Sequence, residues 1–182
     1  MTTTTELPSL QYPIGKYHAP AHIAQSDIKQ WIDDIAALPK QMREAVNNLT
    51  PQQLDTPYRP GGWTVRQLVH HVADSHMNAF IRFKLALTEN NPIIRPYEEA
   101  EWAKGYEYQL SIEPSLIMLE ALHTRWLNVL NHMKQDDFMR TYFHPESKKT
   151  MTMKYVLGMY SWHCRHHLAH ITSLIERNFI NK

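Results

Sequence analysis

The sequence predicts an all-α fold, a four-helix bundle with a long loop between its second and third helices. Four stretches between the prolines repeat apolar residues at helical spacing, whereas the alternation typical of strands is weak. These stretches cover about residues 26–48, 64–87, 114–133 and 153–177. A chain of 182 residues fits one domain, and long helices that each bury one face are typical of a bundle.

The first helix is expected to begin at Ser26, because serine is a common helix cap. Its buried face is predicted from Ile28, Trp31 and Ile35, which recur at helical spacing. Proline has no N–H to donate within a helix, so Pro39 is expected to kink or restart this one.

The second helix has the clearest start signal in the chain. Thr64 and Gln67 have the three-residue spacing of a capping box, in which each side chain bonds to the backbone N–H of the other residue. One side of the helix is apolar and is expected to face the core. Its members are Val65, Leu68, Val69, Val72, Phe80 and Phe83.

The third and fourth helices have weaker start signals. Pro114 is tolerated in the first turn of the third helix, and Thr152 is expected to cap the fourth. The apolar stripe of the third helix consists of Leu116, Leu119, Leu122, Trp126, Val129 and Leu130.

Three other segments are assigned more coarsely. Residues 1–22 are expected to form an N-terminal extension and residues 23–182 a single domain. The connection over 88–112 is long for a bundle and is either a lid or pocket wall, or a loop packed over a helix end. Its aromatic and basic residues include Arg95, Tyr97, Trp102 and Tyr106. Residues 141–150 fit either a small hairpin or a loop.

Composition excludes several classes of function. With 19 basic and 18 acidic residues, the chain has no broad attraction for nucleic acid or for an acidic membrane. No apolar run approaches the roughly 20 residues of a membrane span, and the first residues do not resemble a secretory signal. A cytoplasmic location is therefore expected. The single Cys164 cannot form an intrachain disulfide and is expected to be a small packing residue.

Histidine clusters are the main functional signal, because seven of the 12 histidines occur in two short stretches. His163, His166, His167 and His170 fall within about 100° of one another on a helical wheel. On that face His163 with His167, and His166 with His170, are each one turn apart. Imidazole suits zinc, copper, iron and nickel, so either pair can supply half of a tetrahedral shell.

The second helix carries the other cluster. His76 falls in the middle of its apolar side and is expected to be a core residue, while His70 and His71 lie at opposite edges. Periodicity does not decide which of them binds a metal. Helix histidines are also often simply hydrogen-bonded, but facing helices of bundles do build metal sites.

Longer motifs then point to a family. The segment GGWTVRQLVHHVADSHMNAFIRFKL from Gly61, and YSWHCRHHLAHIT from Tyr160, resemble the DinB/YfiT superfamily. They are most similar to its YfiT branch of metal-dependent hydrolases. The resemblance implies a metal site with one histidine from an H-x-x-D element and two from an H-x-x-x-H element. On this chain those ligands are His71, His163 and His167. A one-residue slip would make His166 and His170 the second pair.

A three-histidine site leaves coordination positions open, which suits catalysis better than structure. The resemblance implies a metal-dependent hydrolase that forms a homodimer. Zinc is the expected metal and nickel the alternative, because both suit imidazole, and the expected substrate is a small molecule. The resemblance also implies a second activity, a bacillithiol-type thiol S-transferase acting on electrophiles. A metal-binding protein without turnover is the third reading.

Further residues are candidates to assist the metal centre. Asp74, one turn beyond His71, is expected either to orient an imidazole or to be solvated. Three arginines are candidates for binding a carboxylate-bearing substrate: Arg59, Arg95 and Arg165. Trp63 and Trp162 are expected to be core residues rather than substrate platforms.

Overall fold

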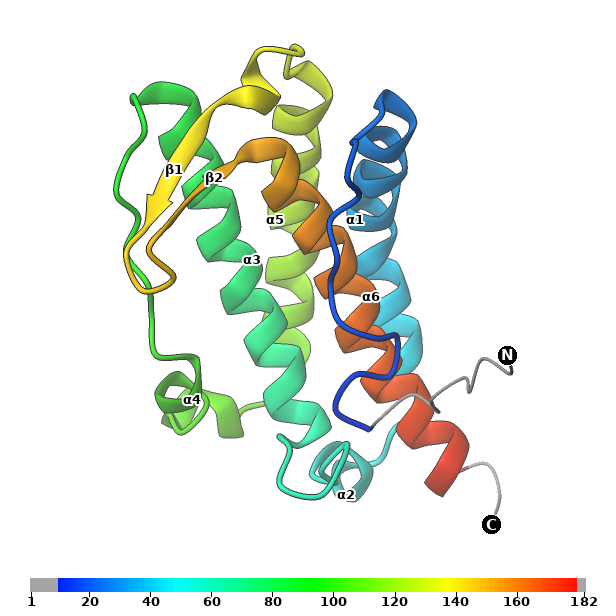
Figure 1. The fold of residues 1–182 in the computed structure, drawn as a ribbon. Coiled ribbons are helices and arrows are strands. Elements are labelled where there is room, and N and C mark those ends of the chain that lie inside the picture. Colours follow the sequence, from blue (N-terminus) through cyan, green and yellow to red (C-terminus); the bar gives the residue numbers. More distant parts are fainter. Residues whose placement is uncertain (1–9, 180–182) are drawn as a thin grey trace, which may run out of the picture.

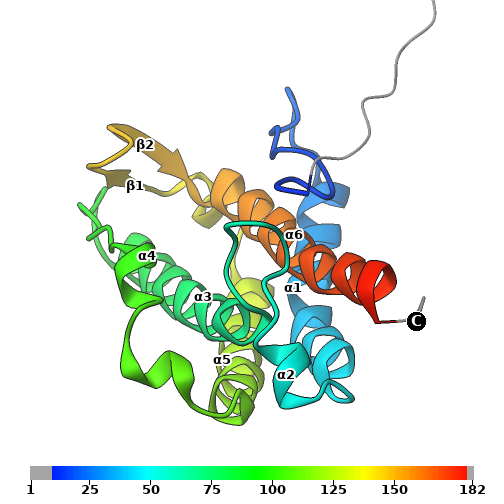
Figure 2. The ribbon, with the colours of Figure 1, turned by 90° about the horizontal axis from the view of Figure 1, so that it is seen from below.

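Four long helices run side by side in the computed structural model, which describes residues 10–179 (Figure 1). They are α1 (Gln25–Val46), α3 (Val65–Thr88), α5 (Glu113–His132) and α6 (Met153–Asn178). Helices α1 and α3 each pack against both α5 and α6, and the end-on view shows the four arranged around one core (Figure 2). The predicted four-helix bundle is confirmed.

Short elements fill the connections between the long helices. They are α2 (Pro51–Leu54), α4 (Glu99–Trp102), the 3₁₀ turns η1 (Tyr106–Gln109) and η2 (Asp137–Met139), and the strands β1 (Thr141–His144) and β2 (Lys149–Thr152). The two strands form an antiparallel hairpin in which Thr141 lies opposite Thr152. Of the two readings of this segment, the hairpin is therefore the one that the structure shows.

Helix α1 differs from its prediction at two places. It begins at Gln25 rather than after a Ser26 cap, because the Asp27 carboxylate accepts a hydrogen bond of 2.8 Å from the Ala24 N–H. It also continues through Pro39 without a restart. Pro39 is buried in the helix together with Leu38 and Met42, so packing against the core holds the helical path across the missing N–H.

The predicted start of α3 is confirmed. Thr64 Oγ1 accepts from the Gln67 N–H at 3.1 Å, and Gln67 Oε1 accepts from the Thr64 N–H at 3.0 Å. Thr152 likewise caps α6, with its hydroxyl oxygen 3.4 Å from the Tyr155 nitrogen. The six apolar residues predicted for the core side of α3 are all buried, so this side faces the bundle interior as expected.

The described part of the N-terminal segment lies along α6 (Figure 1). The Trp162 indole donates to the Gly15 carbonyl at 3.0 Å, and the Tyr17 hydroxyl donates to the Tyr155 carbonyl at 3.4 Å. A Cβ at Gly158 would approach the Tyr17 hydroxyl to 2.6 Å, so glycine permits this close contact. The division at residues 22 and 23 stays a prediction. None of the helices within residues 10–179 is long and apolar enough to cross a membrane.

We expect Thr64→Ala to lower the free energy of unfolding by about 1 kcal/mol, because the substitution leaves an N–H of the first turn of α3 without its acceptor. Thr64→Ser keeps the hydroxyl and is expected to stay close to the wild type. Urea denaturation followed by circular dichroism measures both. Equal denaturation midpoints for Thr64→Ala and Thr64→Ser would contradict the importance of this cap.

Candidate metal centre

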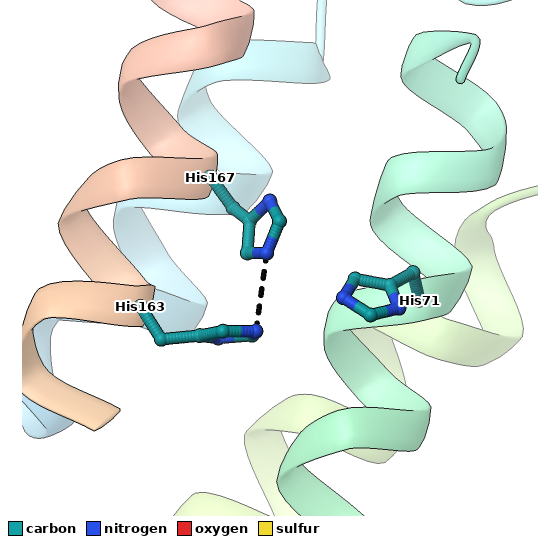
Figure 3. A group of neighbouring side chains, drawn as sticks. All are labelled: His71, His163 and His167. Atoms are coloured by element: carbon teal, nitrogen blue, oxygen red, sulfur yellow. Dashed lines mark hydrogen bonds between the residues drawn. The ribbon is translucent and has the colours of Figure 1, made fainter. Parts of the chain in front are cut away.

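Three histidine rings converge between α3 and α6. His71 points from α3 toward His163 and His167, which lie one turn apart on α6 (Figure 3). One ring nitrogen of each lies within 4.8 Å of the other two. The Nε2 atoms of His163 and His167 are 3.1 Å apart. Two nitrogens bound to one tetrahedral zinc ion are about 3.3 Å apart, so this pair already has nearly the spacing that an ion requires.

Burial keeps these rings uncharged. Loss of water around His71 lowers its pKa to about 4, and burial together with the neighbouring rings holds the pKa of His163 and His167 well below the usual value. Near neutral pH each ring is therefore unprotonated on one nitrogen. That nitrogen has the lone pair which a metal ion requires, so binding need not displace a proton from a charged ring.

Asp74 does not orient His71. Its carboxylate accepts a hydrogen bond of 2.6 Å from the Tyr108 hydroxyl in η1. His71 Nδ1 and His167 Nδ1 are buried and have no hydrogen-bond partner among the described residues. Asp74 lies one helical turn from His71 and faces the 88–112 connection. Its hydrogen bond with Tyr108 therefore holds this connection against α3.

The three histidines line a cavity of about 420 Å³, which we call the histidine pocket. The connection over 88–112 contributes Glu99 to its wall, whereas Tyr97 and Trp102 contact each other beside a different hollow, with ring centroids 4.5 Å apart and planes tilted by 46°. The lining residues are Gln11, Tyr12, Tyr58, Arg59, Gly61, Gly62, Trp63, His71, Glu99, Trp162, His163, His166, His167 and His170.

Both tryptophans assigned to the core line this pocket, and of the two only Trp63 also packs against the core. The Trp63 ring lies 4.5 Å from the His71 ring, and the Trp162 ring stacks on His166 at 4.4 Å with only 16° between the planes. Trp162 and His166 are one turn apart on α6, and that spacing would have predicted the contact. Cys164, in contrast, is buried in the core as expected.

The alternative pair, His166 and His170, has similar spacing but lacks a third ligand. Their Nε2 atoms are also 3.1 Å apart, and Tyr58 packs 4.1 Å from the His170 ring. Within residues 10–179, the one group of three potential ligands that meets at a point is His71 with His163 and His167. This geometry favours the first pair over the slipped one.

The three candidate arginines lie in different places. Arg59 lines the histidine pocket, and its buried Nε has no partner among the described residues. Arg95 lines the other hollow, with Tyr97. Arg165 is 3.2 Å from the carboxylate of Asp34 on α1, so it pairs across two helices outside the pocket. Only Arg59 is therefore placed to meet a ligand of the centre.

A tight loop that the sequence analysis did not single out forms one wall of the pocket. The Gly62 N–H donates to the Arg59 carbonyl at 3.0 Å, and the Tyr58 N–H donates to the Trp63 carbonyl at 3.1 Å across the turn. A Cβ at Gly62 would lie 2.8 Å from the Arg59 side chain. The adjacent glycines in YRPGGW are the signal that predicts such a turn.

The chain is similar to known proteins over most of its length. The model of the DinB superfamily matches residues 29–171, which include all four long helices for most of their length. The chain belongs to the DinB superfamily. The resemblance found in the sequence motifs is thereby confirmed.

Similar proteins cover nearly the whole chain. A protein of Oceanobacillus iheyensis named "Putative metal-dependent hydrolase OB0782" is 52% identical over 167 residues, which are 92% of this chain and 96% of the relative. A "Putative metal-dependent hydrolase" of Bacillus pumilus is 51% identical over 170 residues, or 93% and 97% of the two chains. The structure of YfiT from Bacillus subtilis matches with a TM-score of 0.90 and 46% identity, covering 92% and 97%. YfiT is described as "a probable metal-dependent hydrolase with an unusual four-helix bundle topology".

We expect the metal-free protein to lose stability as the pH falls from about 6.5 to about 4. In this range the unfolded chain protonates His71 and His123, whereas burial holds their pKa in the fold to about 4. The unfolded state then binds more protons, so acid favours it by up to about 3 kcal/mol for each ring. Urea unfolding measured at several pH values tests this. A free energy of unfolding that is the same at pH 7 and pH 5 would contradict it, and His123→Leu should flatten the dependence.

Proposed function

We propose that this chain is a metal-dependent hydrolase whose single divalent ion is held by His71, His163 and His167. The convergence of these three rings from two helices, each with a nitrogen within 4.8 Å of the others, carries the proposal. Relatives more than half identical to this chain, which are named as metal-dependent hydrolases, support it.

The donor set suits a catalytic ion. Three neutral imidazoles leave the charge of the ion uncompensated, and three protein ligands leave at least one coordination position for a water or a substrate. When bound, such an ion lowers the pKa of water toward neutrality and polarises a carbonyl or phosphoryl group. The cavity of about 420 Å³ beside the rings has room for a small molecule.

Other residues of the histidine pocket supply binding and proton transfer. Arg59 carries the positive charge that suits a carboxylate-bearing substrate. Trp63 lies against the ligand His71, and Trp162 stacks on the neighbouring His166, so both limit the access of water to the pocket. Glu99 is the carboxylate in the lining, and burial with the nearby Glu146 raises its pKa. A carboxylate with a raised pKa accepts a proton more readily than an ordinary one.

The finer assignments are part of the proposal. Zinc suits three imidazoles in tetrahedral geometry, and nickel is the other metal that we infer from the donor set. A homodimer and a cytoplasmic location stay predictions. Thiol transfer of the bacillithiol type is the alternative activity, because the open position of such an ion also accepts a thiolate.

We expect the wild type to bind one equivalent of Zn²⁺ after dialysis, and His71→Ala to bind it at least tenfold more weakly, since only two ligands remain. His166→Ala is the matched control, because it removes from the same pocket a ring that is not one of the three proposed ligands. Elemental analysis and chelator competition measure binding. Loss of zinc in His166→Ala with full binding in His71→Ala would overturn the ligand assignment.

The same samples test hydrolysis. Metal-free protein should lose activity on a panel of small ester and amide substrates, and added Zn²⁺ should restore it. A rate that is unaffected by metal removal would refute a metal-dependent hydrolase. If the zinc protein instead accelerates only the reaction of bacillithiol with monochlorobimane, the alternative activity replaces the proposed one.

We expect Glu99→Gln to lower the hydrolytic kcat about 100-fold while zinc binding stays unchanged, because the amide keeps the shape of the side chain but cannot accept a proton. Glu101→Gln is the matched control on the same short helix. Glu101 is exposed and pairs with Lys104, away from the pocket lining. Equal rates for the two variants would remove Glu99 from the proposed chemistry.

A further inference from the structure

A proline leaves one carbonyl in the middle of α1 without its helical partner. The Ile35 carbonyl would accept from the N–H of the residue four positions later, and that residue is Pro39, which has none. Ile35 is fully buried, so water cannot replace the missing donor. A buried carbonyl without a donor costs free energy, and another group must supply the hydrogen bond.

His123 of α5 supplies it. Its Nδ1 lies 2.7 Å from the Ile35 oxygen. A carbonyl oxygen can only accept, so the proton must be on His123 Nδ1. The ring is 1% exposed, and the second hydrogen-bond partner of the ring is another imidazole. A buried ring without a counter-charge is neutral, and its Nε2 therefore carries only a lone pair.

The ring of His76 follows His123 in this chain of hydrogen bonds, and its Nδ1 also donates while its Nε2 accepts. His76 Nδ1 lies 2.8 Å from His123 Nε2. The ring planes are within 10° of each other with centroids 5.0 Å apart, so at this nitrogen separation the two rings lie edge to edge rather than face to face. Because His123 Nε2 accepts, His76 Nδ1 must donate. His76 Nε2 is then left as an acceptor.

This chain of hydrogen bonds ends at His163, in the candidate metal centre. His76 Nε2 lies 3.2 Å from His163 Nδ1, which must therefore donate the proton of this bond. His163 Nε2 is left with its lone pair. It is the same atom that lies 3.1 Å from His167 Nε2 in the ligand cluster (Figure 3).

We propose that His123 and His76 are positioning residues that hold His163 in its Nδ1–H tautomer, anchored on the Ile35 carbonyl that Pro39 leaves free. The inference rests on the metal centre of the proposed function. It adds α5, through His123, and α1, through Ile35, to the helices that support this centre. A neutral imidazole can carry its proton on either nitrogen. A ligand whose other nitrogen has a fixed acceptor keeps both its orientation and its free lone pair.

The tautomers can be read directly in the metal-free protein. We expect long-range ¹H–¹⁵N correlation spectra of the histidine side chains to show protonated Nδ1 and unprotonated Nε2 for His123, His76 and His163. A predominant Nε2–H form of His163 or of His76 would overturn the proposal. This measurement depends on neither metal binding nor activity, so it separates the failure of this inference from the failure of the proposed function.

A variant tests the effect on the metal. His123→Leu removes the acceptor that orders His76, and we expect it to weaken Zn²⁺ binding 10- to 100-fold and to give His163 a mixture of tautomers. Leu119→Ala, a core truncation one turn earlier on α5, is the control. It should lower stability but leave Zn²⁺ affinity within about twofold and the tautomers unchanged. Wild-type affinity and a single His163 tautomer in His123→Leu would refute the positioning role.

Discussion

An imidazole that is taken out of water must be uncharged, and each of its nitrogens needs a partner or a ligand. This constraint governs the interior of the bundle, where seven histidines of residues 10–179 are buried: His70, His71, His76, His123, His166, His167 and His170. His70 has a hydrogen-bond partner in Ser115, whose hydroxyl oxygen is 2.7 Å from His70 Nδ1. The partner of His123 Nδ1 is the backbone carbonyl of Ile35. The rings of the proposed ligand set are only partly satisfied, because two of their nitrogens have no hydrogen-bond partner within the described chain. A cation bound between α3 and α6 would use the lone pairs that these rings bring together.

Rigid elements make that arrangement specific. His163 and His167 keep their spacing because both lie on one helix, and His71 reaches them because α3 packs against α6 in the core. The cap at Thr64 fixes where α3 begins and so the direction of each histidine two turns later. The side chains that surround the ligands come instead from loops and from the outer edge of α6. This division is common in proteins, where a stable scaffold positions variable binding residues.

Much of this could be predicted from the sequence, and the failures have physical reasons. Helical periodicity and capping residues located the four long helices, because these signals are local. The convergence of His71 with His163 and His167 needed the family motif in addition, since periodicity alone placed both His70 and His71 at edges of the apolar side. Local rules failed where a distant contact decided the outcome. Asp74 meets Tyr108 from the 88–112 connection, and Arg165 meets Asp34 from α1. Pro39 stays helical because the core and His123 compensate for its missing N–H.

The N-terminal segment that lies along α6 forms part of the wall of the histidine pocket. Gln11 and Tyr12 line the pocket, yet they precede residue 29, where the match to the superfamily model begins. The segment is held to α6 by the Gly15 carbonyl, which accepts from the Trp162 indole, and by the Tyr17 hydroxyl, which donates to the Tyr155 carbonyl. The rim of the pocket therefore includes a segment that lies outside the match to the superfamily model, and the side chains of Gln11 and Tyr12 border the space through which a ligand would reach the rings.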